Sequence, residues 1–383
     1  MAGYLGYSNT DWARDAATTL ANHIREEEQA WMRSFAIGAM IEAGGNIMYN
    51  QEGRGFDWPV RYRRHNLEGN SGETERNFVQ RNLWQTALLE YRGYQAVDSI
   101  TEKSLQQNRG DSAIIKLWDN FQSRLDESVQ QGLAGEFFVD GSATGNSLRW
   151  HGFESFFGGT QTITEGTAGA VARTANAGDV SLYPSDTYAG LSTILGNYGG
   201  DGDSAATWPR GAADPEFDFW SPLVAHVDTT ATVIGGSADT FAAQGDELLR
   251  FCIIHTQRNS MQNGQLTTCI MDRGFYYAFL NLIDGKEQIR VTRGEPTSLV
   301  SLGFKNVVEF DGLELTWDAA VPVNTGYGLN WKNIELRCMY DSIFKGEGPY
   351  YDEFTQRYNV AVKNLGNLKH KSPRNFFKIA DIV

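Results

Sequence analysis

The residues that most often carry catalysis are spread through this sequence without the spacing that catalysis requires. No two histidines form a His-x-x-x-His or His-Glu-x-x-His pair, which would place two imidazoles on one helical face around zinc. The six histidines are His23, His65, His151, His226, His255 and His370. The sequence therefore predicts no metal site.

Three short motifs resemble binding or catalytic signatures but lack a required residue. Asp201-Gly-Asp203 resembles the start of a calcium loop, yet Ala205-Ala206 interrupt the oxygen ligands that such a loop needs. Gly285-Lys286 lacks the upstream glycine of a phosphate-binding loop, and Gly141-Ser-Ala-Thr-Gly145 lacks the central serine of a nucleophile elbow. We expect neither a catalytic residue nor a cofactor.

One enzymatic alternative stays open at this stage. The chain has 47 acidic residues, which could include the pair of carboxylates that a glycosidase uses, and ten tryptophans that could stack on sugars. A carbohydrate-active enzyme is therefore the alternative from another class of function.

The overall composition indicates a folded protein that does not hold nucleic acid tightly. Of the 383 residues, 41% are hydrophobic and 21% charged, and the formal net charge is -14. Cys252, Cys269 and Cys338 are too widely spaced for a disulfide framework, so a reducing compartment fits best. The apolar runs are too short to span a bilayer, and no secretion signal is evident.

Two amphipathic helices are predicted in the first third of the chain. The first begins near Asn9 or Thr10 and ends near Gly44-Gly45. The second spans 111–138 and presents one apolar face at helical spacing. That face consists of Ile114, Trp118, Phe121, Leu125 and Val129.

Between these helices, two extended runs are predicted to form a ribbon. Phe56, Trp58, Val60 and Tyr62 alternate with polar residues or proline, as in a strand with one apolar face. The run 86–94 can pair back on this strand across a long polar link. Because an isolated two-stranded ribbon is marginally stable in water, the ribbon needs a neighbour.

The remainder of the chain predicts a mixed α and β unit. Residues 158–213 have the Gly, Ala, Thr and Ser content of long surface loops. We expect helices at 240–259 and 273–283 and further strands along the rest of the chain. The expected strands are 266–271, 306–310, 313–317, 333–340 and a C-terminal run within 356–382 that carries a local excess of lysine and arginine.

This order of elements resembles the major capsid proteins of tailed bacteriophages, which share the Hong Kong 97-like fold, an α+β architecture. Short segments in matching order carry the resemblance from about residue 45 onward. They are Gly55-Phe-Asp-Trp-Pro-Val-Arg-Tyr62, Phe137-Phe-Val-Asp-Gly-Ser142, Trp150-His-Gly-Phe153, Tyr188-Ala-Gly-Leu191, Phe219-Trp-Ser-Pro222, Phe310-Asp-Gly-Leu-Glu-Leu315 and Gly326-Tyr-Gly-Leu-Asn330.

The resemblance implies a division of the chain into five parts. These are an N-terminal arm (1–49), an extended loop (50–100), a peripheral domain with a spine helix (101–190), an axial domain (191–345) and a C-terminal return to the peripheral domain (346–383).

The resemblance also implies which residues contact other subunits. The extended loop would lie over an adjacent subunit through Phe56, Trp58, Val60, Arg61, Tyr62, Arg63, Arg64, Arg76 and Arg81. Loops at the centre of a capsomer would carry Asp201, Asp203, Trp208 and Arg210. The C-terminal basic cluster would touch DNA or neutralise a neighbouring subunit, and the core-like residues Phe376, Phe377 and Ile379 within it favour the second.

The implied function is self-assembly as pentamers and hexamers into an icosahedral shell around double-stranded DNA, in a virion assembled in the host cytoplasm. The DNA would be contacted weakly and without sequence specificity, and scaffolding, portal and decoration proteins are candidate partners. An encapsulin-like compartment that holds a protein cargo is the alternative within the fold.

We predict that the proposed loop forms no lysine–asparagine cross-link of the kind that locks some capsids of this family. The region before Lys103 contains ten arginines and no lysine, so it has no amine to donate. Mature shells boiled in detergent are expected to run as single subunits on a gel, and a ladder of high-mass bands would contradict the prediction.

Overall fold

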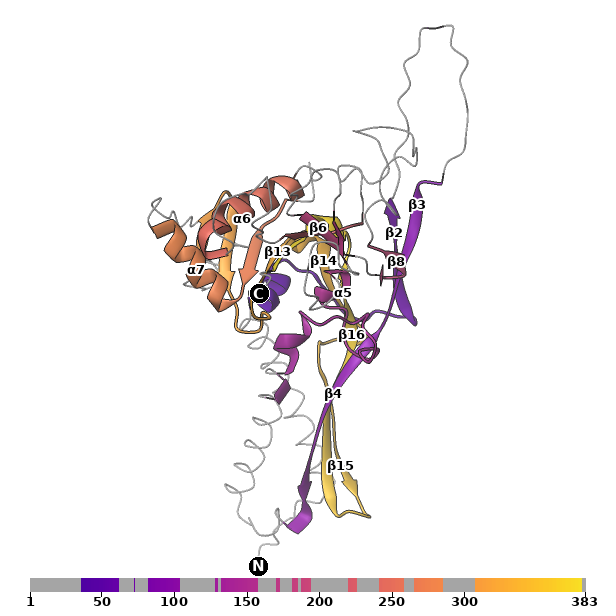
Figure 1. The fold of residues 1–383 in the computed structure, drawn as a ribbon. Coiled ribbons are helices and arrows are strands. Elements are labelled where there is room, and N and C mark those ends of the chain that lie inside the picture. The colour runs from indigo at the N-terminus through magenta and orange to yellow at the C-terminus, as the bar shows by residue number, and fades with distance from the viewer. Residues whose placement is uncertain are drawn as a thin grey trace, which may run out of the picture.

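The computed structural model describes residues 36–61, 72, 82–103, 128–129, 132–157, 170–172, 181–184, 187–193, 220–225, 241–257, 265–284 and 307–380. Within these ranges the chain is a mixed α and β structure, as predicted, with two large sheets that share the C-terminal segment (Figure 1).

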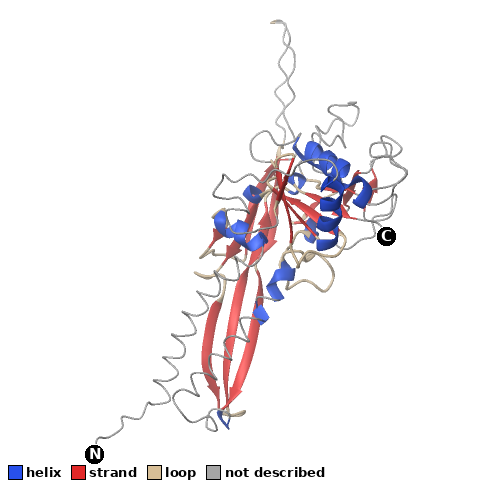
Figure 2. Cartoon of the chain, turned by 90° about the vertical axis from the view of Figure 1, so that its left-hand side faces the viewer, coloured by secondary structure: helices blue, strands red, loops and turns tan. Residues whose placement is uncertain are grey.

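The first sheet, here called the blade sheet, forms the elongated part of the molecule (Figure 2). Its central strand is β16 (Arg357–His370), which pairs antiparallel with β4 (Arg92–Thr101) over Arg357 to Gly366. β15 (Lys345–Asp352) and β14 (Ile334–Cys338) pair antiparallel with successive parts of β16. The short β1 (Ile47–Met48) adds to β14 in parallel.

The second sheet, here called the body sheet, has eight strands. Their order is β11 (Val308–Phe310), β12 (Leu313–Trp317), β10 (Thr268–Met271), β13 (Thr325–Leu329), β17 (Phe377–Ala380), β9 (Leu223–Ala225), β6 (Ser181–Pro184) and β5 (Ala170–Ala172). The elements predicted at 240–259, 266–271, 273–283, 306–310, 313–317 and 333–340 are confirmed, with small shifts of their ends.

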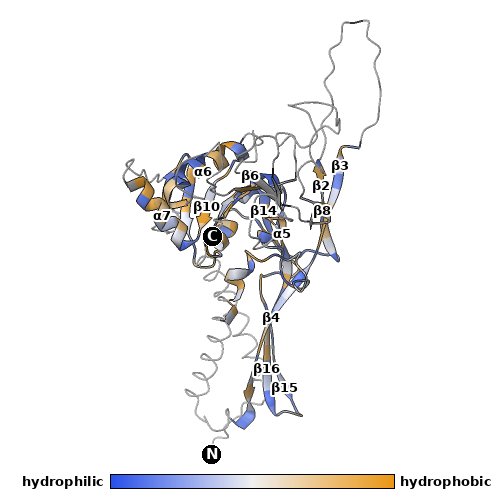
Figure 3. Ribbon diagram, in the orientation of Figure 1, coloured by the Kyte–Doolittle hydropathy of each residue, from blue (hydrophilic) through white to orange (hydrophobic). Residues whose placement is uncertain are grey.

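Two helices cover one face of the body sheet. On β10, Cys269 and Met271 pack into the cluster formed with α6 (Phe241–Gln257) and α7 (Arg273–Asp284), whereas Ile270 belongs to the core on the other face. This alternation follows from the two-residue period of a strand. Figure 3 shows that α7 carries hydrophobic and hydrophilic residues side by side, as an amphipathic helix does.

The predicted end of the first helix is confirmed by α2 (Ala36–Ala43). Gly45 has a φ of +64°, and the amides of Gly45 and Asn46 donate to the carbonyls of Glu42 and Ile41. This is the Schellman arrangement, in which a left-handed glycine satisfies the last carbonyls of a helix. The start of that prediction lies outside the described residues.

The predicted helix at 111–138 is described only near its end, where residues 128, 129 and 132–136 are helical. Val129 is partly buried against the core there, as predicted. Ile114, Trp118, Phe121 and Leu125 lie outside the described residues. Further along the chain, the short helix α5 (Glu154–Phe157) is buried.

The bounds predicted for the second strand of the ribbon, 86–94, are wrong. β2 (Gly55–Arg61) pairs antiparallel with β3 (Trp84–Glu90), but the chain then changes partner, and β4 pairs with β16 instead. The predicted strand 86–94 therefore spans two strands. Gly93 makes this change possible, because a Cβ atom there would lie 2.4 Å from the carbonyl oxygen of Asn364.

The C-terminal segment contributes a strand to each of the two large sheets. β16 belongs to the blade sheet, but β17 pairs with β13 and β9 in the body sheet. One short segment thus ties the two sheets together. All three cysteines are buried free thiols, as expected. None of the helices in the described ranges is long and apolar enough to cross a membrane.

Candidate functional site at the root of the β2–β3 ribbon

The apolar face of β2 is buried against its own chain. Phe56, Trp58 and Val60 are buried and alternate with exposed residues, and Phe56 and Trp58 lie opposite Leu89 and Ala87 of β3. The strand is therefore amphipathic, as predicted. We call these three β2 residues and the groups that cover them the ribbon root.

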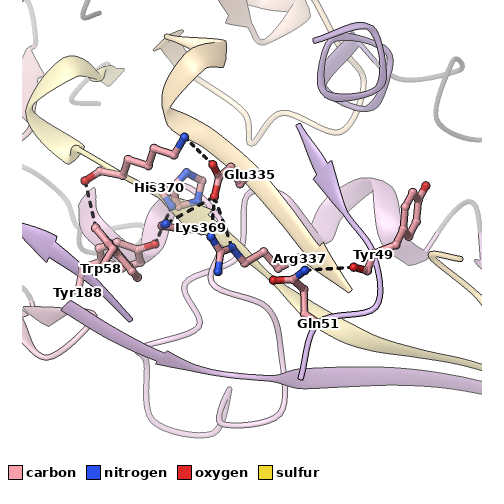
Figure 4. A network of polar contacts seen from close by, with 9 residues as sticks. Tyr49, Gln51, Trp58, Tyr188, Glu335, Arg337, Lys369 and His370 are labelled. Atoms are coloured by element: carbon pink, nitrogen blue, oxygen red, sulfur yellow. Dashed lines mark hydrogen bonds and ion pairs between the residues drawn. The ribbon is translucent and has the colours of Figure 1, made fainter. Parts of the chain in front are cut away.

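Trp58 is the centre of the ribbon root. Its Nε1 atom donates to the carbonyl oxygen of Lys371 at 3.2 Å, and its ring lies beside that of Tyr188 (Figure 4). The ring centre of Trp58 is 6.4 Å from that of Tyr188 and 6.4 Å from that of Trp220. The ammonium group of Lys369 lies 4.9 Å from the centre of the same ring. Such a cation over an indole contributes about 0.5–2 kcal/mol, more when both groups are desolvated.

A buried carboxylate balances the charge of these lysines. Glu335 on β14 lies 2.5 Å from Nζ of Lys371, 3.5 Å from Nζ of Lys369 and 3.2 Å from the guanidinium of Arg337. Arg337 in turn lies 5.0 Å from the ring centre of Phe56. The network thus connects β14, β16 and the apolar face of β2.

Opposing effects act on the charged groups of this network. Burial alone would raise the pKa of Glu335, but the hydrogen bond from Lys371 and the charges of Lys369, Lys371 and Arg337 outweigh it, so the pKa is lowered. Burial lowers the pKa of Lys369, although the charge of Glu335 opposes this shift. Removing one member would leave a buried charge without its partner, which is strongly destabilising.

A second buried ion pair joins α5 to the body sheet. Nζ of Lys378 on β17 lies 2.7 Å from Glu154, and the hydroxyl of Tyr327 on β13 also donates to this carboxylate. Burial raises the pKa of Glu154, and the charge of Lys378 and the two hydrogen bonds oppose that effect. All three side chains are buried.

Two buried histidines lie beside the ribbon root. Nε2 of His370 is 3.1 Å from the carbonyl oxygen of His151, and because a carbonyl only accepts, Nε2 carries the proton. Nδ1 of each imidazole has no hydrogen-bond partner among the described atoms. Phe153, Phe156 and Phe376 surround His370 with ring centres 4.9–6.0 Å away.

Phe56, Trp58 and Val60 were predicted to contact another subunit; within the single chain these side chains are covered by other parts of the same chain, and the contact with a neighbour remains a prediction. The face of the ribbon that remains open is the opposite one. There Trp84 and Leu88 of β3 are 54% and 57% exposed, in the row that also contains Arg61. Of the remaining loop predictions, Tyr62, Arg63, Arg64, Arg76 and Arg81 lie outside the described residues, as do Asp201, Asp203, Trp208 and Arg210.

The C-terminal basic cluster was expected to contact DNA or a neighbouring subunit, and that contact remains a prediction; within the chain, its lysines have acidic partners. Lys363 pairs with Glu347, Lys369 and Lys371 with Glu335, and Lys378 with Glu154, all within one chain. Neither of the two buried carboxylates, Glu335 and Glu154, could be singled out from the sequence. The available signal was the placement of lysines within apolar strands, as in Phe377-Lys-Ile-Ala380.

The buried carboxylates Glu335 and Glu154 are both held in ion pairs. Among the described residues, no group of histidine, cysteine and acidic side chains could hold a metal ion.

Solved capsid structures contain chains with a similar fold. A chain of the cyanophage A-1(L) capsid asymmetric unit matches with a TM-score of 0.53 and 13% identity, over 91% of this chain and 94% of the other. A chain of the capsid of the native GTA particle matches with a TM-score of 0.51 and 9% identity, over 90% of both chains. The chain has the Hong Kong 97-like capsid fold.

The likeness is one of structure alone. No protein-family model matches the sequence, and no curated protein matches it. The predicted fold is confirmed.

We predict that Trp58→Ala lowers the free energy of unfolding by about 3–5 kcal/mol, because it removes a buried aromatic side chain and its support for Lys369. Trp84→Ala is the matched control on the partner strand and should change stability by only about 0.5 kcal/mol, because this side chain is exposed. Chemical denaturation of unassembled subunits measures both. Equal losses of unfolding free energy in the two variants would contradict the conclusion that the Trp58 face of the ribbon is the buried one.

We predict that the subunit loses stability as the pH falls below about 6.5. Burial lowers the pKa of His151 and His370 to about 3 each, so between these values the unfolded chain binds protons that the folded chain does not. Each histidine contributes a slope of up to about 1.4 kcal/mol per pH unit. The variant His370→Gln should show a shallower acid dependence in denaturation curves, and an unchanged slope would contradict the prediction.

Proposed function

We propose that this chain is the major capsid protein of a tailed bacteriophage. It assembles as pentamers and hexamers into an icosahedral shell that encloses double-stranded DNA. The observation that carries the proposal is the match to capsid chains over about nine tenths of both partners.

In this proposal the parts of the chain take the roles expected from the fold. The ribbon is the extended loop, the blade sheet and the helix at 111–138 form the peripheral domain, and the region 191–345 supplies the axial domain with Asp201, Asp203, Trp208 and Arg210 at the capsomer centre. Arg63, Arg64, Arg76 and Arg81 contact other subunits. The net charge of -14 keeps the wall from holding packed DNA tightly.

The outer face of the ribbon is where we place the contact with the next subunit. The inner face is already filled, whereas Trp84 and Leu88 project from β3 with more than half of their surface exposed. Many modest contacts of this kind, repeated by symmetry, make a closed container stable. Scaffolding, portal and decoration proteins are further partners, and assembly takes place in the host cytoplasm. Nothing among the described residues favours an encapsulin-like cargo compartment or a carbohydrate-active enzyme.

Electron microscopy of the expressed chain tests the proposal. Uniform hollow particles or rings of five and six subunits are the expected result. A chain that stays monomeric at high concentration would overturn the proposal.

We predict that the double variant Trp84→Glu, Leu88→Glu folds normally but fails to close shells. Both side chains are exposed in the subunit, so the free energy of unfolding should change by about 1 kcal/mol or less. New carboxylates in a packed contact between subunits are costly, because they lose their water. Particle yield by sedimentation measures the effect, and wild-type yields would place the contact elsewhere.

A further inference from the structure

Arg92 lies where the ribbon ends and the blade sheet begins, at the first position of β4. Its Nη1 atom lies 2.6 Å from the carbonyl oxygen of Gly141, 3.2 Å from that of Asn146 and 2.8 Å from that of Arg149. All three carbonyls belong to residues 140–149, here called the post-helix turn because it follows the predicted spine helix. A guanidinium presents its N–H donors in a fixed plane, so Arg92 can hold several carbonyls of one turn at once.

The post-helix turn is shaped to receive this side chain. A Cβ atom on Gly141 would lie 2.9 Å from Nη1 of Arg92 and 2.5 Å from the carbonyl oxygen of Trp150. Any side chain there would therefore displace the guanidinium or the backbone, which is why glycine suits this close approach. The side-chain amide of Asn146 donates to the carbonyl oxygen of Asp140 at 2.8 Å and closes the turn.

Tyr94 connects the same turn to the end of the helix. It lies two residues after Arg92 and therefore on the same face of β4. Its hydroxyl donates to Glu136 at 2.5 Å and accepts from the amide of Trp150 at 2.6 Å. The guanidinium of Arg149 also lies 2.6 Å from Glu136. The start of β4, the helix end and the post-helix turn are thus joined by one set of hydrogen bonds.

Asn367 on β16 ties the last residue of the ribbon to the same set of bonds. Its side-chain amide donates to the carbonyl oxygen of Glu90 at 2.8 Å, and its side-chain oxygen accepts from the amide of His151 at 2.9 Å. Because Asn367 is fully buried, losing either contact would leave a buried polar group unsatisfied. The ion pair between Arg54 and Glu90 is instead exposed, and such pairs contribute little.

We propose that Arg92 is a positioning residue for assembly, which fixes the direction of the ribbon by holding the post-helix turn against the start of β4. An isolated ribbon of two strands is marginally stable, so the joints at its base set where it points. Trp58 anchors β2, and Arg92 anchors the continuation of β3 into β4. Only the link to assembly rests on the proposed function, because the direction of the ribbon decides where the exposed Trp84 and Leu88 meet another subunit.

Hydrogen exchange at single-residue resolution tests the positioning in unassembled full-length subunits. The amide of Leu88 donates at 3.0 Å to the carbonyl oxygen of Ala189, outside the ribbon, so its protection reports where the ribbon lies. Arg92→Met should make this amide exchange several-fold faster, whereas the amides of α6 should exchange as in the wild type. An unchanged rate at Leu88 in the folded variant would overturn the proposal, because a merely local effect would be confined to the post-helix turn.

The matched control is Arg54→Met, which removes another arginine from the base of the ribbon. Its ion pair with Glu90 is exposed, so the exchange of Leu88 should not change. Arg92→Lys keeps the charge, but an ammonium group cannot span three carbonyls as the planar guanidinium does, so exchange should again be faster. Gly141→Ala perturbs the same contact from the turn and should act in the same way. Should Arg92→Met fail to fold, wild-type protection of Leu88 in both of these milder variants would overturn the proposal.

Shell formation separates this inference from the proposed function. Folded Arg92→Lys subunits should close fewer shells than Arg54→Met subunits at equal concentration, as measured by sedimentation. Equal shell yields would overturn the link between Arg92 and assembly and leave the proposed function standing. A wild-type chain that forms neither rings nor shells would remove the proposed function, whereas faster exchange of Leu88 in Arg92→Met would still support the positioning of the ribbon.

Discussion

The contact between the Trp58 ring and the Lys369 ammonium group determines how the extended part of this molecule joins the rest. Lys369 can remain charged beneath the ring only because Glu335 lies nearby, and Glu335 is shared with Lys371 and Arg337. Displacing β2 would expose the aromatic face and disturb this charge balance at the same time. The ribbon is therefore fixed at its base, while its outer face stays free to meet another surface.

Successive residues at the end of β16 point in opposite directions, so this segment contacts both the ribbon root and the core. Lys369 and Lys371 lie on the side of Trp58 and Glu335, and His370 between them packs among phenylalanines near α5. A few residues later, Lys378 on β17 reaches Glu154 of α5. The C-terminal segment thus crosses from the blade sheet to the body sheet with a buried ion pair on each. Buried ion pairs add little net stability but penalise incorrect arrangements, because any other packing leaves a charge unpaired.

Helices and strands with a regular spacing of apolar residues were predicted well from the sequence. The contacts that individual side chains make were predicted poorly. α6, α7 and β12 follow from helical or alternating patterns that are complete within a short window. The pattern around Trp58 correctly indicated that one face of β2 is buried. It could not indicate that the same chain buries this face, because Tyr188, Trp220 and Lys369 lie more than a hundred residues away. Alternating apolar residues indicate that one face of a strand is buried, but they do not indicate which segment covers that face.

The lysines of the C-terminal segment illustrate a second limit. In the sequence they resemble a basic surface, since lysine is rarely buried without a partner. Their partners are Glu335, which is 34 and 36 positions before Lys369 and Lys371, and Glu154, which is 224 positions before Lys378. The residues around a lysine do not indicate an acidic partner that lies so far away in the sequence. The apolar face of the ribbon root could therefore be predicted, but the ion pairs of its lysines could not. The capsomer-centre residues proposed from the sequence, such as Trp208, lie outside the described residues and remain a prediction.

The burial of the three cysteine thiols has a practical consequence for chemical labelling. Cys252, Cys269 and Cys338 are buried, and burial raises the pKa of Cys252 and Cys269, so little reactive thiolate forms near neutral pH. A cysteine introduced at an exposed position would therefore react with maleimide far faster than the native ones. Every subunit would then accept one dye or one tethered cargo molecule at a chosen place, with the natural cysteines left intact.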